Sequence, residues 1–428
     1  MLDRSIAPKI HSVENIHFQQ PVEHQLSNGI KVWEVHTDKQ DVIKLDIFFR
    51  AGRPYEQQKM VARACSRLLQ EGTRQHDSAA ISEILDYHGA SLANPVDLDS
   101  SNMVLYCLSK HFEKLLPLFA EIIKEPNFPE GEIEQFKQSH KQKLKINEAK
   151  VDVKAYRLIT ESIFGPDHPY GYNSSLKGFD ALNRKEILAH FDRTHHAAAA
   201  EIIISGNTKP ATIQLLDKHL GDLPKGREIK ASFGEIPSLS SHQHIQMDGA
   251  LQTAIRIGFK TFNRAHPDYE KFYLLNTILG GYFGSRLMMN IREEKGYTYN
   301  IFSSLDTMVH DGYFYVGTEV GTDFQEDTLK QIHLEMERLK KEPVGKEEFD
   351  MVRNYLMGNL LSLFDGPLAQ SEVVKKMRLL QMPFSTVNKL VQAIQQTSAE
   401  DLMEIANKYF QKDKYFEVII GNKKLNED

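Results

Sequence analysis

Residues 42–50 read VIKLDIFFR, a run of branched and aromatic side chains that predicts a β-strand. Residues 252–260, QTAIRIGFK, predict a second one. In both places a small or charged turn follows, and then a long helical pattern, MVARACSRLLQEG in the first case and FYLLNTILGG in the second. The recurrence of strand, turn and helix indicates that the chain contains the same structural unit twice.

Two further elements recur in the same order. Lys-Glu-Pro at 124–126 and again at 341–343 lies between an amphipathic helical pattern and a longer one. The closing strands EIIISGN and FEVIIGN end at Asn207 and Asn422, 215 residues apart. A Glu-Pro pair alone would be chance, but four elements at offsets of roughly 209–217 residues predict a duplicated domain.

A chain of 428 residues is long enough for two domains, each with its own core. A stretch rich in proline, glycine and serine separates the halves, so we expect a first domain over 1–228, a linker over 229–244 and a second domain over 245–428. Several adjacent strands are joined by short turns. The predicted fold class is therefore α+β, with two homologous domains that each have a largely antiparallel sheet and helices packed on one face.

Composition excludes several classes of protein. The chain has 52 Lys and Arg against 58 Asp and Glu, a net charge of −6. It therefore lacks the excess of basic residues that is typical of nucleic-acid-binding proteins. No apolar run approaches the ~20 residues of a membrane span, and residues 1–20 have no secretory pattern, so no membrane association and a cytoplasmic location are expected. The only cysteines, Cys65 and Cys107, are expected to be buried thiols, which suits a reducing compartment.

The segment SRLMMNIREEKGYTYNIFSS, residues 285–304, resembles a conserved stretch of the insulinase-type (pitrilysin-like) zinc metallopeptidases. In that family an Arg and a Tyr seven positions apart act on substrate, and here they are Arg292 and Tyr299. LSNGIKVW at 26–33 and GPDHPYG at 165–171 are similar to the same family. The resemblance implies a half-length subunit with the α+β domain used twice. Two such chains, or one double-length chain, would close as a clamshell over a peptide.

Active members of the family carry His-x-x-Glu-His on the first long helix, and a third ligand, Glu, lies roughly 76 residues downstream. The two His ligands lie on one helical face, and the Glu between them serves as general base. Aligned here, the ligand positions hold Arg63, Arg67 and Lys143, and the base position holds Ser66. Arginine stays protonated and offers no lone pair to a metal. The resemblance therefore implies a degenerate zinc site, and we expect this chain to bind no metal or other cofactor.

Other readings of these residues stay open. Arg63 and Arg67 could be helix-surface charges, with Glu71 as partner of Arg67, or they could bind acidic groups of a partner. Active members often have an Asn on the sheet-edge strand that receives substrate; Ala93 occupies that position here, although a shift of one residue would restore Asn94.

The remaining candidate residues are expected to be structural or accessory. Cys65 is expected to be a small buried hydrophobe rather than a nucleophile. Tyr297 could share the site of Arg292 and Tyr299 by strand alternation, whereas Tyr299 could instead simply pack within that strand. The histidines without acidic or cysteine companions are not expected to bind a metal; they are His195, His196, His242 and His244.

The leading hypothesis is a non-catalytic peptidase subunit. It would pair with a sister chain that holds zinc, as a heterodimer, and supply Arg292 and Tyr299 to the peptide cleaved there. A homodimer remains open. The first alternative is a non-proteolytic assembly or peptide-binding protein of the same fold. A second alternative is a peptidase with an unrecognised site, which chelator-sensitive cleavage by the single chain would favour.

Overall fold

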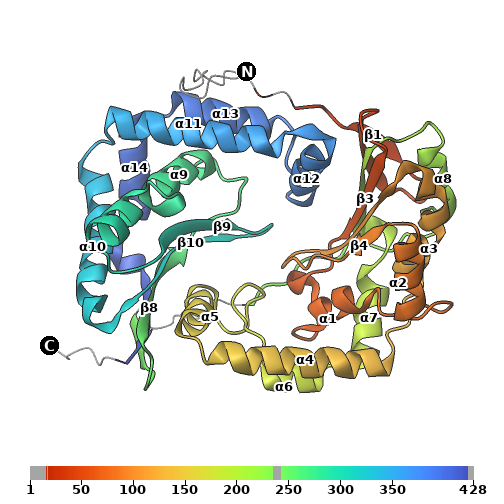
Figure 1. Cartoon of the computed structure of the whole chain (residues 1–428), viewed down its shortest axis with the longest axis horizontal. Helices are drawn as coiled ribbons and strands as arrows, with labels where there is room; N and C mark the ends of the chain where they lie inside the picture. The colour runs from red at the N-terminus through yellow and green to blue at the C-terminus, as the bar shows by residue number, and fades with distance from the viewer. Residues whose placement is uncertain (1–15, 17, 235–241, 423–428) are drawn as a thin grey trace, which may run out of the picture.

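The computed structural model describes residue 16, residues 18–234 and residues 242–422. It has two halves, each with one β-sheet and a layer of helices (Figure 1). The first sheet is formed by β1 (Val22–Gln25), β2 (Lys31–His36), β3 (Val42–Phe49), β4 (Ser91–Ala93), β5 (Ser101–Leu108) and β6 (Ala200–Gly206). The first-half helices are α1 (Val61–Leu68), α2 (Ser78–Tyr87), α3 (Phe112–Lys124), α4 (Glu130–Glu148), α5 (Val151–Phe164), α6 (Leu176–Ala181), α7 (Arg184–Thr194) and α8 (Thr212–Leu220).

The second half repeats this plan. Its strands are β7 (His242–Gln246), β8 (Gln252–Lys260), β9 (Ile301–Thr307), β10 (Gly312–Gly321) and β11 (Phe416–Gly421). Its α-helices are α9 (Tyr269–Asn276), α10 (Gln325–Lys341), α11 (Lys346–Leu363), α12 (Gly366–Leu379), α13 (Thr386–Gln396) and α14 (Ala399–Tyr409). The π-helical segments η4 (Thr277–Gly281) and η5 (Met288–Glu294) follow α9.

The two sheets share one topology. The strand order is β1-β2-β6-β3-β5-β4 in the first and β7-β11-β8-β10-β9 in the second, so five strands correspond one to one. In each sheet a single neighbouring pair is parallel, β2 with β6 and β7 with β11, and the other pairs are antiparallel. The predicted fold class, two α+β domains with largely antiparallel sheets, is confirmed.

Both closing strands end in a glycine because another strand passes too close for a side chain. A Cβ atom on Gly206, at φ +113°, would lie 1.9 Å from the Val42 carbonyl oxygen. A Cβ atom on Gly421 would lie 2.2 Å from Oγ1 of Thr253. These contacts join the closing strand to the strand of residues 42–50 in one half and to that of residues 252–260 in the other. The repeated SGN and IGN endings thus have the same steric origin.

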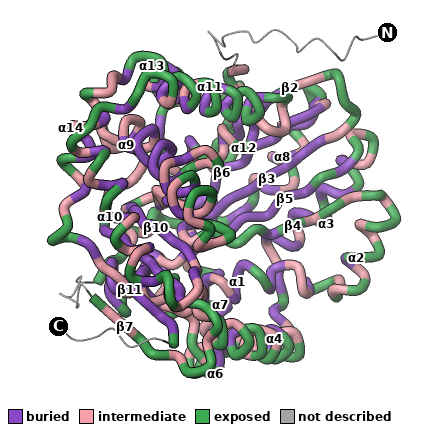
Figure 2. The backbone as a smooth tube through the Cα atoms, turned by 60° about the vertical axis from the view of Figure 1, so that its left-hand side comes forward, coloured by how far each residue is buried: buried purple, intermediate pink, exposed green. Residues whose placement is uncertain are grey.

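Each sheet also carries one helix from the opposite half. The main core of each half lies between its sheet and its own helices. On the other face, α5 of the first half packs against β8 and β11, while α12 of the second half packs against β2 and β6 (Figure 1). Helices α5 and α12 begin at Val151 and Gly366, which are 215 residues apart, so they are equivalent members of the repeat. The halves therefore exchange one helix each, and the central strands are buried (Figure 2).

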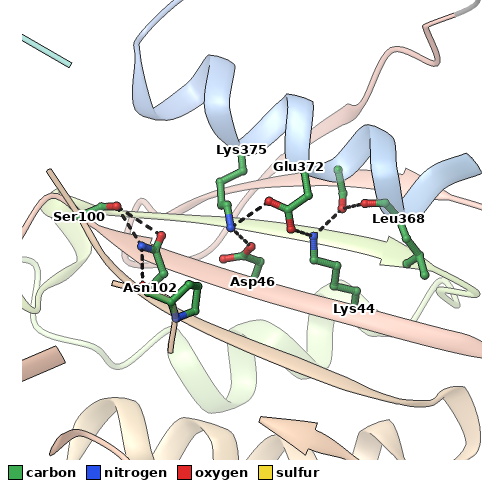
Figure 3. Close-up of polar contacts among 9 residues, drawn as sticks. Lys44, Asp46, Ser100, Asn102, Leu368, Glu372 and Lys375 are labelled. Carbon is green, nitrogen blue, oxygen red and sulfur yellow. Dashed lines mark hydrogen bonds and ion pairs between the residues drawn. The ribbon is translucent and has the colours of Figure 1, made fainter. Parts of the chain in front are cut away.

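The contact made by α12 is partly ionic (Figure 3). Lys44 and Asp46 of β3 are 1% and 0% exposed, so both charges depend on partners. Lys44 donates to Ser371 Oγ at 2.9 Å and pairs with Glu372, and Lys375 pairs with Asp46 at 2.6 Å. Burial without such partners would be costly for each charge, so these pairs fix the register of α12 on the sheet.

The boundary between the halves differs from the expected one in its last residues. Strand β7 begins at His242, within the segment predicted as linker, and pairs in parallel with β11. Its sequence, HQHIQ, lacks the apolar alternation that announces a strand, because it is an edge strand with mostly exposed side chains. Linker residues 235–241 lie outside the described residues. Among the described helices, none has the length and apolar character of a membrane span.

Candidate functional site

Helix α1, which holds the aligned motif positions, begins without a capping side chain at its N-cap residue. The N-cap is Met60, at φ 74°, and Glu56 accepts a hydrogen bond from the Ala62 amide at 2.9 Å instead. The other Glu56 oxygen accepts from the Tyr172 hydroxyl at 2.7 Å. Burial raises the pKa of Glu56 from its ordinary 4.5 to about 7, although these hydrogen bonds oppose the change. The start of α1 thus rests on a carboxyl group that is partly protonated near neutral pH.

The structure brings together the three positions aligned with zinc ligands. Arg63 and Arg67, one turn apart on α1, and Lys143 on α4 line the same pocket of about 450 Å³. Burial lowers the pKa of the Arg63 guanidinium, and Arg53 and Arg67 lower it further. Arginine remains protonated even so. The alignment therefore identifies residues that are neighbours in space, and all three carry positive charge.

Ser66 and Asn94 have different places at this pocket. Ser66 is 2% exposed and is absent from the pocket lining, and its hydroxyl has no hydrogen-bond partner among the described residues. Strand β4 is the edge of the first sheet and ends at exposed Ala93. Asn94 follows it, is 4% exposed, and donates from Nδ2 to the carbonyls of Ser66 at 2.6 Å and Arg67 at 3.2 Å. Ala93 is thus the strand residue, and Asn94 fastens the strand end to α1.

The donor set of this pocket does not fit zinc. Zinc sites in proteins use thiolate, imidazole and carboxylate ligands, whereas the three ligand positions hold two guanidinium groups and an ammonium group. No cluster of three or more His, Cys, Asp or Glu side chains suited to a metal occurs in the described part of the chain. No step of a metal-dependent reaction can therefore be assigned to these residues.

The cysteines and paired histidines are placed in structural surroundings. Cys65 and Cys107 are buried and unbridged, and burial raises the pKa of the Cys65 thiol, so it is a poor nucleophile. His195 and His196 are 4% and 5% exposed at the end of α7, where burial lowers the pKa of both rings. In β7, His242 pairs with Glu417 at 3.1 Å.

Arg292 and Tyr299 are adjacent in space; Tyr299 is exposed, whereas Arg292 is half-buried. Arg292 lies in η5, and its guanidinium carbon is 5.1 Å from the Tyr299 ring centroid and 4.7 Å from that of Phe283. The Tyr299 side chain is 86% exposed and Phe283 is 60% exposed. In the described part of the chain, the only ion pair of Arg292 is with Glu293 at 3.5 Å. The cation is held between two exposed aromatic faces, which is a cation–π arrangement.

Tyr297 belongs to a different cluster. Strand β9 begins at Ile301, so Tyr297 and Tyr299 precede the strand, and the expected alternation does not relate them. Tyr297 donates its hydroxyl proton to Asp327 at 3.0 Å and stacks on Phe324 with ring centroids 4.4 Å apart. Tyr299 likewise does not pack within a strand. Phe283, the third member of the exposed cluster, was not predicted; its one signal is an aromatic residue in the glycine-rich segment GGYFG.

Comparison with known proteins agrees with this arrangement. Residues 31–165 match the model of the insulinase family, peptidase family M16, and residues 181–356 match that of the peptidase M16 inactive domain. The chain is 23% identical over 394 residues to an uncharacterized zinc protease of Rickettsia felis, covering 90% of this chain and 94% of that one. It is 21% identical over 400 residues to the non-peptidase homolog YmxG of Helicobacter pylori, covering 89% of each.

The structural comparison covers still more of the chain. A peptidase M16 inactive domain from Pseudomonas fluorescens superposes with a TM-score of 0.88 at 24% identity, covering 96% of this chain and all of that one. The duplicated sheet topology, the positions of the degenerate motif and both family matches point to one assignment. The chain belongs to the insulinase-type family of metallopeptidases, family M16, as a half-length, two-domain member without the His-x-x-Glu-His motif.

Proposed function

We propose that this chain is a non-catalytic subunit of an insulinase-type zinc metallopeptidase. It pairs with a sister chain that carries an intact His-x-x-Glu-His site and supplies Arg292 and Tyr299 to the peptide cleaved there. The observation that carries the proposal is the contact of exposed Tyr299 with half-buried Arg292. The Tyr299 side chain is 86% exposed, and its ring centroid is 5.1 Å from the guanidinium carbon of Arg292. The pair thus combines an exposed aromatic ring with hydroxyl and guanidinium donors that a ligand can use.

The chemistry of the pair suits a peptide under attack. A guanidinium group is a permanent, planar set of donors for a peptide carbonyl or carboxylate. The phenol can donate a hydrogen bond to the carbonyl oxygen as negative charge develops on it. The ring faces of Phe283 and Tyr299 limit the positions open to the Arg292 guanidinium, so less side-chain entropy is lost on binding.

The test is steady-state kinetics of peptide hydrolysis by the complex of this chain with a zinc-bearing chain of the same organism. Tyr299→Phe removes one hydroxyl and should lower kcat by up to ~10²–10³-fold, the usual loss for one oxyanion donor. Arg292→Ala should also raise KM, because bound substrate and transition state both use its charge. Tyr297→Phe is the matched control, since that hydroxyl serves Asp327; its turnover should stay at the wild-type value.

Association of the two chains, checked by sizing, should be the same for all variants. Wild-type turnover of both Tyr299→Phe and Arg292→Ala in an intact complex would reject the substrate role. A complex that forms but hydrolyses no peptide with wild-type subunits would favour the alternative of an assembly or peptide-binding protein of the same fold.

A further inference from the structure

The pocket that replaces the zinc site contains more positive charge than its surroundings neutralise. Two guanidinium groups, an ammonium group and an imidazole line it, from Arg63, Arg67, Lys143 and His140. Within the described chain none of the ion pairs shorter than 4.0 Å involves the three cations. Nε of Arg63 is buried without a hydrogen-bond partner in that part of the chain. Like charges kept together in this way are unfavourable unless an anion joins them.

The acidic side chains of the same pocket leave these charges free. Glu71 and Glu132 line it, but neither is within ion-pair distance of a cation in the described residues. Burial raises the pKa of Glu71, and the nearby Glu132 raises it further. The ion pair between Glu71 and Arg67, considered from the sequence, is therefore not formed. Arg67 instead donates from Nη1 to Asn94 Oδ1 at 3.5 Å, a long contact to a neutral group.

The walls of the pocket are fixed. Asn94 fastens the end of β4 to the α1 backbone through two hydrogen bonds, and the ring of His140 lies 4.1 Å from that of Phe136 on α4. Burial lowers the pKa of His140, and the neighbouring cations Arg63, Lys143 and Arg67 lower it further. The histidine therefore stays neutral at pH 7. Its Nδ1 donates to the Phe136 carbonyl oxygen at 2.9 Å, which leaves Nε2 as a hydrogen-bond acceptor.

We propose that this pocket is a carboxylate-binding site for peptides. Arg63 and Arg67, one helical turn apart, present two forks of N–H donors, and Lys143 supplies a third positive group from the opposite wall. We assign the carboxylate to a peptide because the edge strand β4 leads into the pocket through Asn94. An extended peptide can add to such an edge strand. The site lies on the first half and is independent of Arg292 and Tyr299.

Calorimetric titration of the full chain with three acetylated hexapeptides tests the assignment. The first is the acetylated, amidated hexapeptide Ala-Ser-Ala-Glu-Ala-Ser. The second carries Gln in place of Glu, and the third is this Gln peptide with a free terminal carboxylate. At least one acidic peptide should bind ~10-fold or more tightly than the neutral one, with affinity falling as salt rises to about 0.15 M. Tighter binding of the first peptide would identify the ligand as a side-chain carboxylate, and tighter binding of the third would identify it as a terminal carboxylate.

Two variants and a matched control locate the site. Arg67→Gln should lose at least ~10-fold in affinity for the acidic peptide, and Lys143→Gln a smaller part of that, because an ammonium group lacks the planar fork of donors that a guanidinium group offers to a carboxylate. Lys145→Gln, on the same exposed helix but outside the pocket, changes the net charge equally and should bind as the wild type does. Folding is checked by circular dichroism.

Equal affinity for acidic and neutral peptides would overturn the proposal, as would equal losses in Lys143→Gln and Lys145→Gln. Binding of inorganic phosphate without preference for either acidic peptide would overturn the peptide assignment. The titration needs no zinc-bearing partner, so its failure is distinguishable from failure of the proposed subunit function.

Discussion

Arg63, Arg67 and Lys143 define the chemistry of the first half at the scale of single residues. Helix geometry predicts that Arg63 and Arg67 lie on one face, and the family resemblance implies that Lys143 lies beside them, as the structure places it. Two features could not be predicted. The inward turn of Asn94 and the burial of Ser66 depend on how the end of β4 packs against α1, which no sequence pattern encodes.

The purified chain should bind no stoichiometric zinc, because guanidinium and ammonium groups repel the ion and offer it no lone pair. Elemental analysis after dialysis measures this. The quadruple variant Arg63→His, Ser66→Glu, Arg67→His and Lys143→Glu is the positive control and should gain zinc affinity. A content of about one zinc ion per wild-type chain would contradict the account of the site.

Glu56 predicts a dependence of stability on pH. Its pKa in the folded chain is about 7 against an ordinary 4.5, so between these values the folded state binds more protons than the unfolded state. The free energy of unfolding should therefore fall as pH rises from 4.5 to 7, by at most about 3 kcal/mol from this group. Glu56→Gln should remove this loss. Urea unfolding should show a higher free energy of unfolding for the variant, relative to the wild type, at pH 8 than at pH 5. A difference between the two proteins that is the same at both pH values would refute the assignment.

At the scale of elements, the sequence predicts the repeat but not the exchange of helices. Strand and helix patterns, with the recurring Lys-Glu-Pro and Gly-Asn endings, reveal corresponding elements in the two halves. An apolar stripe shows that α5 and α12 are covered on one face, but it does not show which half covers them. The polar strand β7 was missed for a related reason, since pairing with β11 rather than its own side chains holds it in place.

Glu201 of β6 is a second sheet carboxylate, besides Asp46, that pairs with α12. It is 5% exposed and accepts from Trp33 Nε1 at 2.8 Å, Arg50 Nη2 at 3.0 Å and Arg378 Nε at 2.8 Å. Burial alone would raise the pKa of Glu201, but the hydrogen bonds from Arg378, Arg50 and Trp33 outweigh it and lower the pKa. Three donors from both halves thus converge on one charge.

Glu201→Gln should destabilise the chain by roughly 3–5 kcal/mol at pH 7, because two arginines lose their counter-charge in a buried place. Fluorescence of Trp33, the single tryptophan, reports urea unfolding and the release of α12 together. Because the folded pKa is lowered, the cost is present above the ordinary value of 4.5 and should disappear as pH falls through the folded value. Glu337→Gln, which breaks the more exposed pair with Lys340, is the control and should cost under about 1 kcal/mol. If Glu201→Gln lowers the free energy of unfolding by no more than Glu337→Gln does, the apolar contacts alone hold α12.

At the scale of the whole molecule, the exchanged helices hold the two halves as one unit with two candidate surfaces, one on each half. The second half carries exposed Tyr299 against half-buried Arg292, and the first half carries a cationic pocket at the positions aligned with a zinc site. The three positions aligned with zinc ligands carry cationic side chains, which do not suit zinc. The proposed function therefore assigns the metal to another chain.

The most direct test of this account is the rate of hydrolysis of a fluorogenic peptide by this chain, by a zinc-bearing chain of the same organism, and by an equimolar mixture of the two. The account predicts that this chain alone is inert, that the zinc-bearing chain alone is slow, and that the mixture is fast, with the gain lost in a mixture made with Tyr299→Phe. Chelator-sensitive hydrolysis by this chain alone, or a full rate from the zinc-bearing chain without it, would contradict the central claim.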